Sequence, residues 1–210
     1  LTHAAQLTLP YQVDVDASGT SYVAGKGHYV RMITPGGSVT TLGGDGTANY
    51  LERPTAGSPA SQFNQAWGVA LKPSTTTLYV ADGINSRIRT INTADLVTTT
   101  AAGTGAGGCT DGPGAVARLQ RPFGFAWHVA SGVLYFSDYY FHAIRRLAAD
   151  HSVTTVAGTG AKAVTDARGV LAEFAQPFGV SFDGDYLYIA ENNGNNVRLF
   201  DVVTGHVTTL

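Results

Sequence analysis

The sequence predicts an all-β protein, a β-propeller of four-stranded antiparallel blades, and two observations carry the prediction. Runs of β-branched and aromatic residues are broken by Gly, Asp, Ser and Asn along all 210 residues, with no sustained helical period. The same four-strand pattern returns about every 55 residues and opens each time on an aromatic residue: Tyr11, Trp67, Phe123 and Phe178. A fixed period of this size indicates a solenoid, a propeller or an array, and four antiparallel strands per period favour a propeller blade.

Four repeats cover nearly the whole chain, at about residues 7–44, 63–105, 119–160 and 174–210. The expected strands are 11–15, 20–24, 29–33 and 38–42; 67–71, 77–81, 86–91 and 96–101; 123–127, 133–137, 143–147 and 153–157; and 178–182, 186–190, 196–200 and 206–210. The first strand of each repeat is expected nearest the axis, where Gly68, Gly124 and Gly179 suit close approach of neighbouring strands. The side chains expected to pack blade on blade are Leu78, Val80, Ile88, Ile91, Leu134, Phe136, Ile144, Leu147, Leu187, Ile189, Val197 and Leu199.

Three linkers join the repeats, at residues 43–62, 103–118 and 158–173. They are too long for tight turns, and loops longer than about 12 to 15 residues are usually functional or disordered. Within them, Ala115–Leu119 and Gly169–Phe174 could each form one helical turn. The linkers and the turns between second and third strands are expected on one rim of the propeller. We expect function at that rim, because its sequence varies between repeats.

The repeated sequence motifs resemble those of a known family. Leu78–Asp82 with Ile88-Arg89, and Phe178–Val180 with Val197-Arg198, are similar to the NHL repeat. The linker segment that begins at Asp111-Gly112-Pro113 resembles the linkers of long-linker NHL proteins. The first repeat departs most from the pattern, since Gln12 stands in place of the Gly and Gly25 in place of the Asp.

The resemblance implies a fold more specifically than a function. NHL-repeat proteins include RNA-binding, protein-binding, sensor and lyase members, and they usually have more than four blades. We therefore expect residues 1–210 to form a single NHL-type propeller domain or a fragment of one, within a larger ring of about six blades; a small four-bladed ring is the alternative. An open arc would expose sheet faces at its ends and favour self-association through open blade edges.

Composition excludes some classes of partner. Charged residues make up 13% of the chain, against about 25% in average domains, and the net charge is −2. Such a chain has no global attraction for nucleic acid or anionic lipid, and it contains no apolar run that could span a bilayer. The single cysteine, Cys109, is expected to be an ordinary loop thiol, and no cofactor is implied. Scarce Lys and abundant Thr favour an extracellular or cell-surface setting without deciding the compartment.

Several polar positions repeat from blade to blade, which favours an architectural role for them. Asp82, Asp138 and Glu191 share one position, where a carboxylate is expected to cap its own turn. The arginines of the third strands are expected to bridge to the Asp of a neighbouring blade. His28 and His142 fall on the same rim and are weak candidates for a zinc site, for which no third ligand is identifiable.

The sharpest feature that does not repeat is a turn with three aromatic residues, Tyr139, Tyr140 and Phe141. Exposed Tyr side chains give large contact area at low entropic cost, so they indicate a binding surface; the alternative is packing under the adjacent linker. The residues expected to bind a partner are Tyr139, Tyr140, Phe141, His142, Arg118, Arg121, Asn192 and Asn193.

The sequence therefore predicts a non-catalytic interaction module that binds a protein, peptide or glycan partner at the rim. A metal-dependent propeller lyase or hydrolase with His28 and His142 near the axis is the first alternative. An RNA-binding NHL domain is the second, and it would need a basic rim, which Asp45, Asp111 and Asp166 weaken.

Overall fold

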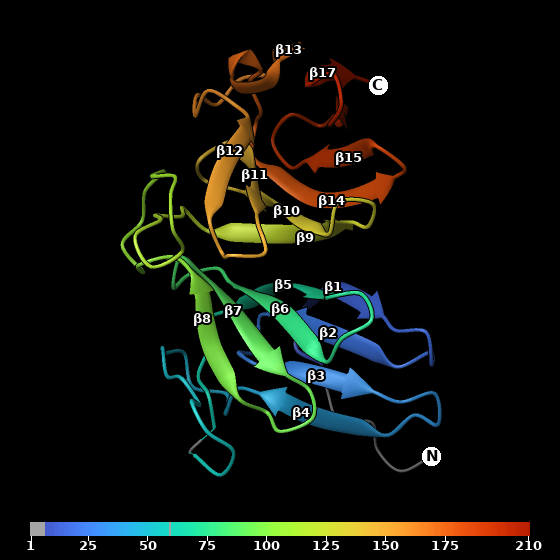
Figure 1. The fold of residues 1–210 in the computed structure, drawn as a ribbon, viewed down its shortest axis with the longest axis vertical. Helices are drawn as coiled ribbons and strands as arrows, with labels where there is room; N and C mark the ends of the chain where they lie inside the picture. The colour runs from blue at the N-terminus through green and yellow to red at the C-terminus, as the bar shows by residue number, and fades with distance from the viewer. Residues whose placement is uncertain (1–6, 59) are drawn as a thin grey trace. The chain divides into compact units, whose positions relative to one another are not determined.

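A computed structural model describes residues 7–58 and 60–210 of the chain. It divides the protein into two compact units, of which the first ends at Ala101 and the second begins at Ala102. Each unit contains two four-stranded antiparallel blades (Figure 1). The four repeats and the all-β fold class are thereby confirmed, whereas the single-domain prediction for residues 1–210 remains a prediction.

The first unit holds blades 1 and 2, whose strands follow one another in chain order. Blade 1 consists of β1 (Pro10–Val15), β2 (Ser21–Gly25), β3 (Val30–Ile33) and β4 (Val39–Gly43). Blade 2 consists of β5 (Ala66–Leu71), β6 (Thr77–Asp82), β7 (Arg87–Asn92) and β8 (Thr98–Ala102), the last residue of which opens the second unit. These bounds lie within two residues of the expected strands, because Gly, Asp and Ser turns end each β-branched run.

The second unit holds blades 3 and 4. Blade 3 consists of β9 (Pro122–His128), β10 (Val133–Asp138), β11 (Ala143–Leu147) and β12 (Val153–Ala157). Blade 4 consists of β14 (Pro177–Asp183), β15 (Tyr186–Glu191), β16 (Val197–Asp201) and β17 (His206–Thr209), and the linker adds β13 (Ala167–Arg168) to its outer edge.

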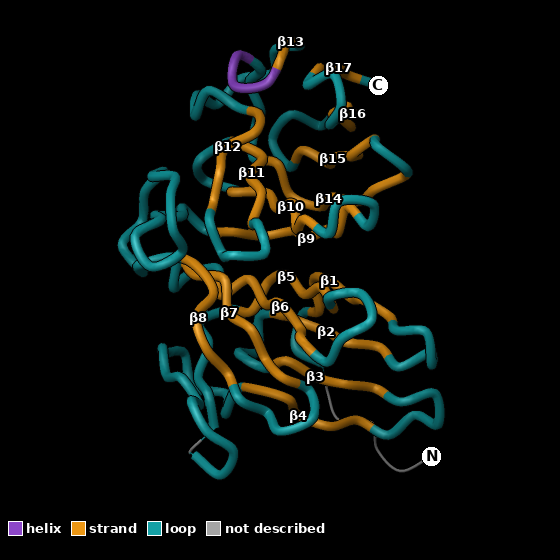
Figure 2. The backbone as a smooth tube through the Cα atoms, in the orientation of Figure 1, coloured by secondary structure: helices purple, strands orange, loops and turns teal. Residues whose placement is uncertain are grey.

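The linkers contain very little helix. A short 3₁₀ turn, η1 (Gly169–Leu171), lies where a helical turn was expected, and it is drawn in purple in Figure 2. At the other expected turn, the Ala117 N–H donates to the Pro113 carbonyl and closes a single turn without forming a helix. No helix of the described residues is long and apolar enough to cross a membrane.

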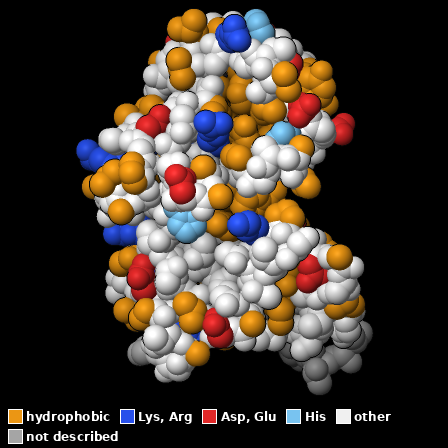
Figure 3. Space-filling view, viewed as in Figure 1, with side chains coloured by type: hydrophobic (Ala, Val, Ile, Leu, Met, Phe, Trp, Pro, Cys, Tyr) orange, Lys and Arg blue, Asp and Glu red, His pale blue; other side chains and the backbone are white. Residues whose placement is uncertain are grey.

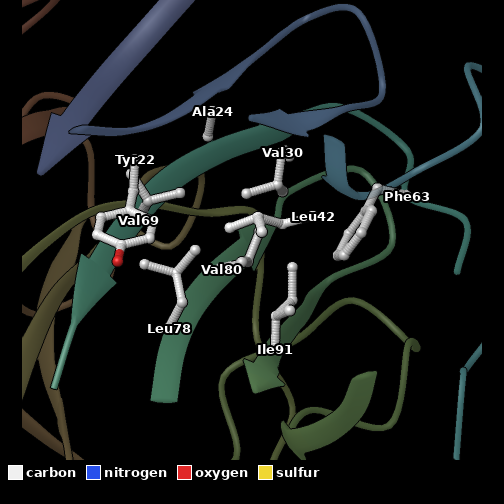
Figure 4. Packing of buried hydrophobic residues seen from close by; sticks show 10 residues of the cluster. Tyr22, Ala24, Val30, Leu42, Phe63, Val69, Leu78, Val80 and Ile91 are labelled. Atoms are coloured by element: carbon white, nitrogen blue, oxygen red, sulfur yellow. The ribbon is translucent and has the colours of Figure 1, made fainter. Parts of the chain in front are cut away.

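Apolar side chains of facing sheets form the core of each unit. In the first unit, Tyr22 and Val30 of blade 1 pack against Val69, Leu78 and Val80 of blade 2 (Figure 4). In the second unit, side chains of blade 3 pack in the same way against those of blade 4. The buried members there are Tyr135, Ile144 and Ala157 of blade 3 and Leu187, Ile189, Phe200 and Val207 of blade 4.

Two of the expected packing residues are placed differently. Val197 is 45% exposed and Leu199 is only half-buried, although Ile144, which occupies the position of Val197 in blade 3, is fully buried. The prediction for Val197 was wrong, because no sheet of the described residues covers this face of blade 4. Strand alternation alone cannot tell whether another sheet covers a face.

Blade 4 presents this uncovered face along β15 and β16. The second-strand Tyr is 5% exposed in blade 1 (Tyr22) and 6% in blade 3 (Tyr135), but Tyr188 of blade 4 is 37% exposed. Tyr186 and Val197 are exposed on the same face, and hydrophobic side chains gather in Figure 3 where β14 and β15 run. An uncovered apolar face of this kind is what a further blade or a second molecule would cover, so the larger ring and self-association both remain predictions.

Candidate functional site

A buried arginine lies at the centre of blades 2, 3 and 4. Its guanidinium is fully buried in each and forms an ion pair with the carboxylate that ends the second strand of its own blade. The pairs are Arg89–Asp82 at 3.1 Å, Arg145–Asp138 at 2.9 Å and Arg198–Glu191 at 3.6 Å. The expectation that these arginines bridge to a neighbouring blade was wrong. Adjacent antiparallel strands place the end of the second strand beside the start of the third, so the pair forms within one sheet.

The same carboxylates also anchor the chain that enters each blade. Each accepts a backbone N–H from the residue two positions before the first strand, and not from its own turn as expected. The donors are Asn64 to Asp82 at 2.8 Å, Gln120 to Asp138 at 2.8 Å and Ala175 to Glu191 at 2.6 Å. The repeated carboxylate therefore connects the linker end to the second and third strands, which explains why each of these three blades needs it.

A second carboxylate, supplied by the linker, reaches the arginine in blades 3 and 4. Asp111 lies 2.8 Å from Arg145, and it also accepts the backbone N–H of Thr155. Asp166 makes the matching ion pair with Arg198 at 2.8 Å. The arginines thus hold the long linkers against the blades, which gives these linkers an architectural role.

The single positive charge of Arg145 cannot fully neutralise the charges of two carboxylates when one of them, Asp138, is completely buried. Burial raises the pKa of Asp138 to about 6, although the neighbouring Arg145 partly opposes the rise. Burial would also raise the pKa of Asp111, but hydrogen bonds from Thr155 and Arg145 outweigh it and lower that pKa below its usual value. Arg145 therefore lies between an exposed carboxylate that ionises readily and a buried one that holds a proton more tightly.

The two rim histidines have matching structural contacts. His28 Nδ1 accepts the backbone N–H of Gln65 at 3.1 Å, and His142 Nδ1 accepts that of Gln176 at 3.2 Å. A neutral imidazole that accepts at Nδ1 carries its proton on Nε2. A metal bound at Nε2 would require the proton on Nδ1, which could then no longer accept this hydrogen bond. Burial, with a smaller contribution from Lys162, lowers the pKa of His142. The described residues include no group of three His, Cys, Asp or Glu side chains placed to hold a metal ion.

The turn after β10 brings several of the expected binding residues together. The Tyr139 hydroxyl donates to Gln176 Oε1 at 3.1 Å and accepts from Asn192 Nδ2 at 2.8 Å. Asn193 Nδ2 also donates to Gln176 Oε1. Turns of two blades therefore meet at one hydrogen-bonded cluster, which we call the Tyr139 cluster: Arg121, Tyr139, Tyr140, Gln176, Asn192 and Asn193.

Aromatic contacts complete this cluster. Tyr140 is 41% exposed and meets Tyr139 edge to face, with ring centroids 4.9 Å apart. The Arg121 guanidinium lies over the Tyr140 ring, 4.5 Å from its centroid. Tyr139 also contacts Phe123 and Phe178, each with a centroid separation of 6.0 Å. The exposed Tyr140 therefore packs against Tyr139, which itself packs against two further aromatic rings.

The close approach of blades 3 and 4 fixes the positions of the Phe123 and Phe178 rings. The Phe123 and Phe178 ring centroids lie 3.7 Å apart. The Ser137 hydroxyl accepts from the Gly124 N–H and donates to the Phe178 carbonyl, which joins the two inner strands. A Cβ at Gly124 would lie 2.4 Å from that carbonyl, so only Gly fits there.

Other expected binding residues lie apart from the cluster or behind it. Phe141 is half-buried and its ring meets Gly160 of the following linker, as the packing alternative predicts. Arg118 donates to the Gly107 carbonyl at 2.5 Å and orders its own linker. His142 is linked to the cluster by a hydrogen bond from the backbone N–H of Gln176. Gln176 was missed by sequence reasoning, although Gln65 at the matching position of blade 2 was an available signal.

Comparison with known proteins identifies the repeats. No protein-family profile matches the chain. NHL repeat-containing protein 2 of Homo sapiens is 30% identical over 178 residues, which are 79% of this chain and 24% of that protein. The chain belongs to the NHL-repeat β-propeller proteins. It spans about a quarter of the length of that NHL protein, and 16% of a second relative that is also 30% identical, the chloroplastic protein SUPPRESSOR OF QUENCHING 1 of Arabidopsis thaliana.

Solved structures agree with the NHL propeller fold. An auxiliary nutrient binding protein from Bacteroides ovatus has a TM-score of 0.66 at 20% identity, with 92% of this chain and 46% of that chain covered. A streptogramin B lyase has a TM-score of 0.60 at 12% identity, with 95% and 53% covered. A chain of a nidogen/laminin complex has a TM-score of 0.57 at 15% identity, with 96% and 79% covered. Identities this low show the fold alone, since one propeller fold serves several functions.

Proposed function

We propose that this chain is a non-catalytic NHL interaction module that binds a protein, peptide or glycan partner at the rim of blades 3 and 4. One observation carries the proposal. Tyr139 is held by Gln176 and Asn192, and it supports an exposed Tyr140 at a turn whose sequence occurs in no other blade.

The chemistry of the Tyr139 cluster suits recognition. An exposed Tyr offers an apolar ring with a polar end, and fixed amide groups offer both donors and acceptors. Because hydrogen bonds and ring packing already fix the cluster, little side-chain entropy is lost when a partner binds, which favours affinity. The architecture itself does not require these residues, since blade 2 has Gly83 and Ile84 at the positions of Tyr139 and Tyr140.

The test is an array of peptides and glycans probed with the purified chain, as the natural protein and as the Tyr139→Ala/Tyr140→Ala variant. We expect the variant to lose binding and to remain folded, with a lowered thermal unfolding midpoint because the Tyr139 ring no longer packs on Phe123 and Phe178. Ile84→Ala, in the matching turn of blade 2, is the control and should bind normally. Unchanged binding by the double variant would refute the assignment of the rim.

A further inference from the structure

The guanidinium of Arg121 has no partner of its own among the described residues. Arg89, Arg145 and Arg198 each form an ion pair with a carboxylate. Arg121 instead lies over the exposed ring of Tyr140, and the part of the chain that the structure describes supplies it with neither a carboxylate nor another hydrogen-bond acceptor. Its charge is therefore available to a ligand.

Contact with the Tyr140 ring restrains the position of this charge. A guanidinium is planar, and packing against an aromatic ring restricts its plane while leaving its N–H edge directed away from the ring. That edge matches the two oxygens of a carboxylate, with which Arg forms paired hydrogen bonds. Arg121 and Tyr140 together therefore form a ready site for a carboxylate.

Neutral amide groups lie at the Tyr139 hydroxyl. The Tyr139 hydroxyl is occupied by Gln176 and Asn192. The structure records hydrogen bonds for Gln176 Oε1 and for the Nδ2 atoms of Asn192 and Asn193, but among the described residues it records none for Gln176 Nε2 or for the Oδ1 atoms of the two asparagines. Asn192 and Asn193 are exposed, so their two Oδ1 acceptors are available to a ligand and match the N–H groups of a peptide backbone, whereas Gln176 is buried and holds Tyr139.

We propose that the Tyr139 cluster binds an acidic peptide segment, with an Asp or Glu carboxylate on Arg121 and peptide backbone on the exposed amides of Asn192 and Asn193. This inference rests on the function proposed above and narrows its partner. A peptide is favoured over a sugar because Arg121 covers one face of Tyr140, the surface on which a sugar ring would stack.

Paired peptides test the inference directly. An array carries acidic peptides beside twins in which every Asp and Glu is replaced by Asn and Gln, together with neutral and uronic-acid oligosaccharides. We expect the chain to bind acidic peptides at least about tenfold more tightly than their twins, because a carboxylate forms paired, charge-assisted hydrogen bonds with a guanidinium and an amide does not.

Two variants of Arg121 test whether this residue causes the preference for acidic peptides. Arg121→Gln should remove the preference for acidic peptides, and Arg121→Glu should shift it toward Lys-containing peptides. Arg146→Gln is the control, because Arg146 is exposed on β11 and lies outside the Tyr139 cluster. Thermal unfolding of each variant verifies that it folds.

The outcomes separate this inference from the broader one. Equal binding of acidic peptides and their twins, or an unchanged preference in Arg121→Gln, overturns the acidic specificity and leaves the rim site standing if Tyr139 and Tyr140 are still required. Binding of uronic-acid oligosaccharides alone overturns the peptide class. Binding of no peptide and no glycan overturns the proposed function as well.

Discussion

The buried arginines, on the third strands, and the Tyr139 cluster, on the turn before one of those strands, lie close together in the chain and have different roles. The position of Arg145 holds an arginine in blades 2, 3 and 4, each fully buried and paired within its blade. Tyr139 and Tyr140 follow directly after Asp138, yet they occur in one blade only, and Tyr140 is exposed. The repeated polar residues hold the strands of each blade together. The unrepeated residues of the adjoining turn are not needed for this, so they can take part in binding.

The buried arginine and its carboxylate partners are arranged differently in the two blades. In blade 3, Asp138 approaches Arg145 to 2.9 Å, whereas in blade 4 the longer Glu191 approaches Arg198 only to 3.6 Å. Asp166 of the linker lies 2.8 Å from Arg198 and supplies the closer contact there. The linker therefore matters more to the ion pair in blade 4 than in blade 3.

The largest effect is expected from Arg145→Ala. It leaves Asp138 buried without its cation and Asp111 without its partner, and breaking a buried pair in this way costs about 3–5 kcal/mol of unfolding free energy. Chemical denaturation measures the loss. Arg146→Ala, at the exposed neighbouring residue, is the control and should change stability by less than about 0.5 kcal/mol. Equal effects of the two substitutions would contradict an architectural role for the centre.

The next effect concerns pH. The folded pKa of Asp138, about 6, lies above its ordinary value of 3.8, so the folded state holds the proton more tightly than the unfolded state does. The stabilisation is fully present below about pH 4 and is lost as the pH rises through 6; it amounts to about 3 kcal/mol. Denaturation at pH 4.5 to 7.5 should therefore show stability falling with pH.

Asp138→Asn is the control for the pH prediction, because it removes the titrating group and should flatten this part of the profile. Asp111 has a lowered pKa, so the stability it contributes is present above about pH 4 and is lost only at more acid values, outside the range measured. A natural protein and an Asp138→Asn variant with parallel profiles would rule out a raised pKa at Asp138.

The smallest effect on stability is expected from Tyr139→Phe. The change removes the hydroxyl that joins Gln176 to Asn192 and keeps the ring on Phe123 and Phe178, so it should cost about 1 kcal/mol. Affinity for a rim partner should fall more than stability does, since the amides lose their fixed orientation. Thermal unfolding and binding to the same array, measured side by side, check this; a large loss of stability with normal binding would make Tyr139 an architectural residue.

Sequence reasoning reached the fold almost completely and the candidate site in part. Strands, turns and the repeat follow from residues close together in the chain, so Leu78–Asp82 and its counterparts were placed correctly. Tyr139 and Asn192 were both expected on the rim, but they are 53 residues apart, and nothing local predicts their hydrogen bond. Gln176 was missed for the same reason.

The sequence by itself determined the blade: its four strands, its turns and the positions of its repeated carboxylate and arginine. Those depend on alternation and turn chemistry, which act over a few residues. Only the tertiary structure decided which carboxylate each arginine meets, which faces are covered and which rim residues touch. Tyr22 and Tyr188 occupy the same repeated position, yet one is buried and the other is 37% exposed, because burial depends on the sheet packed against it and not on the strand that carries the residue.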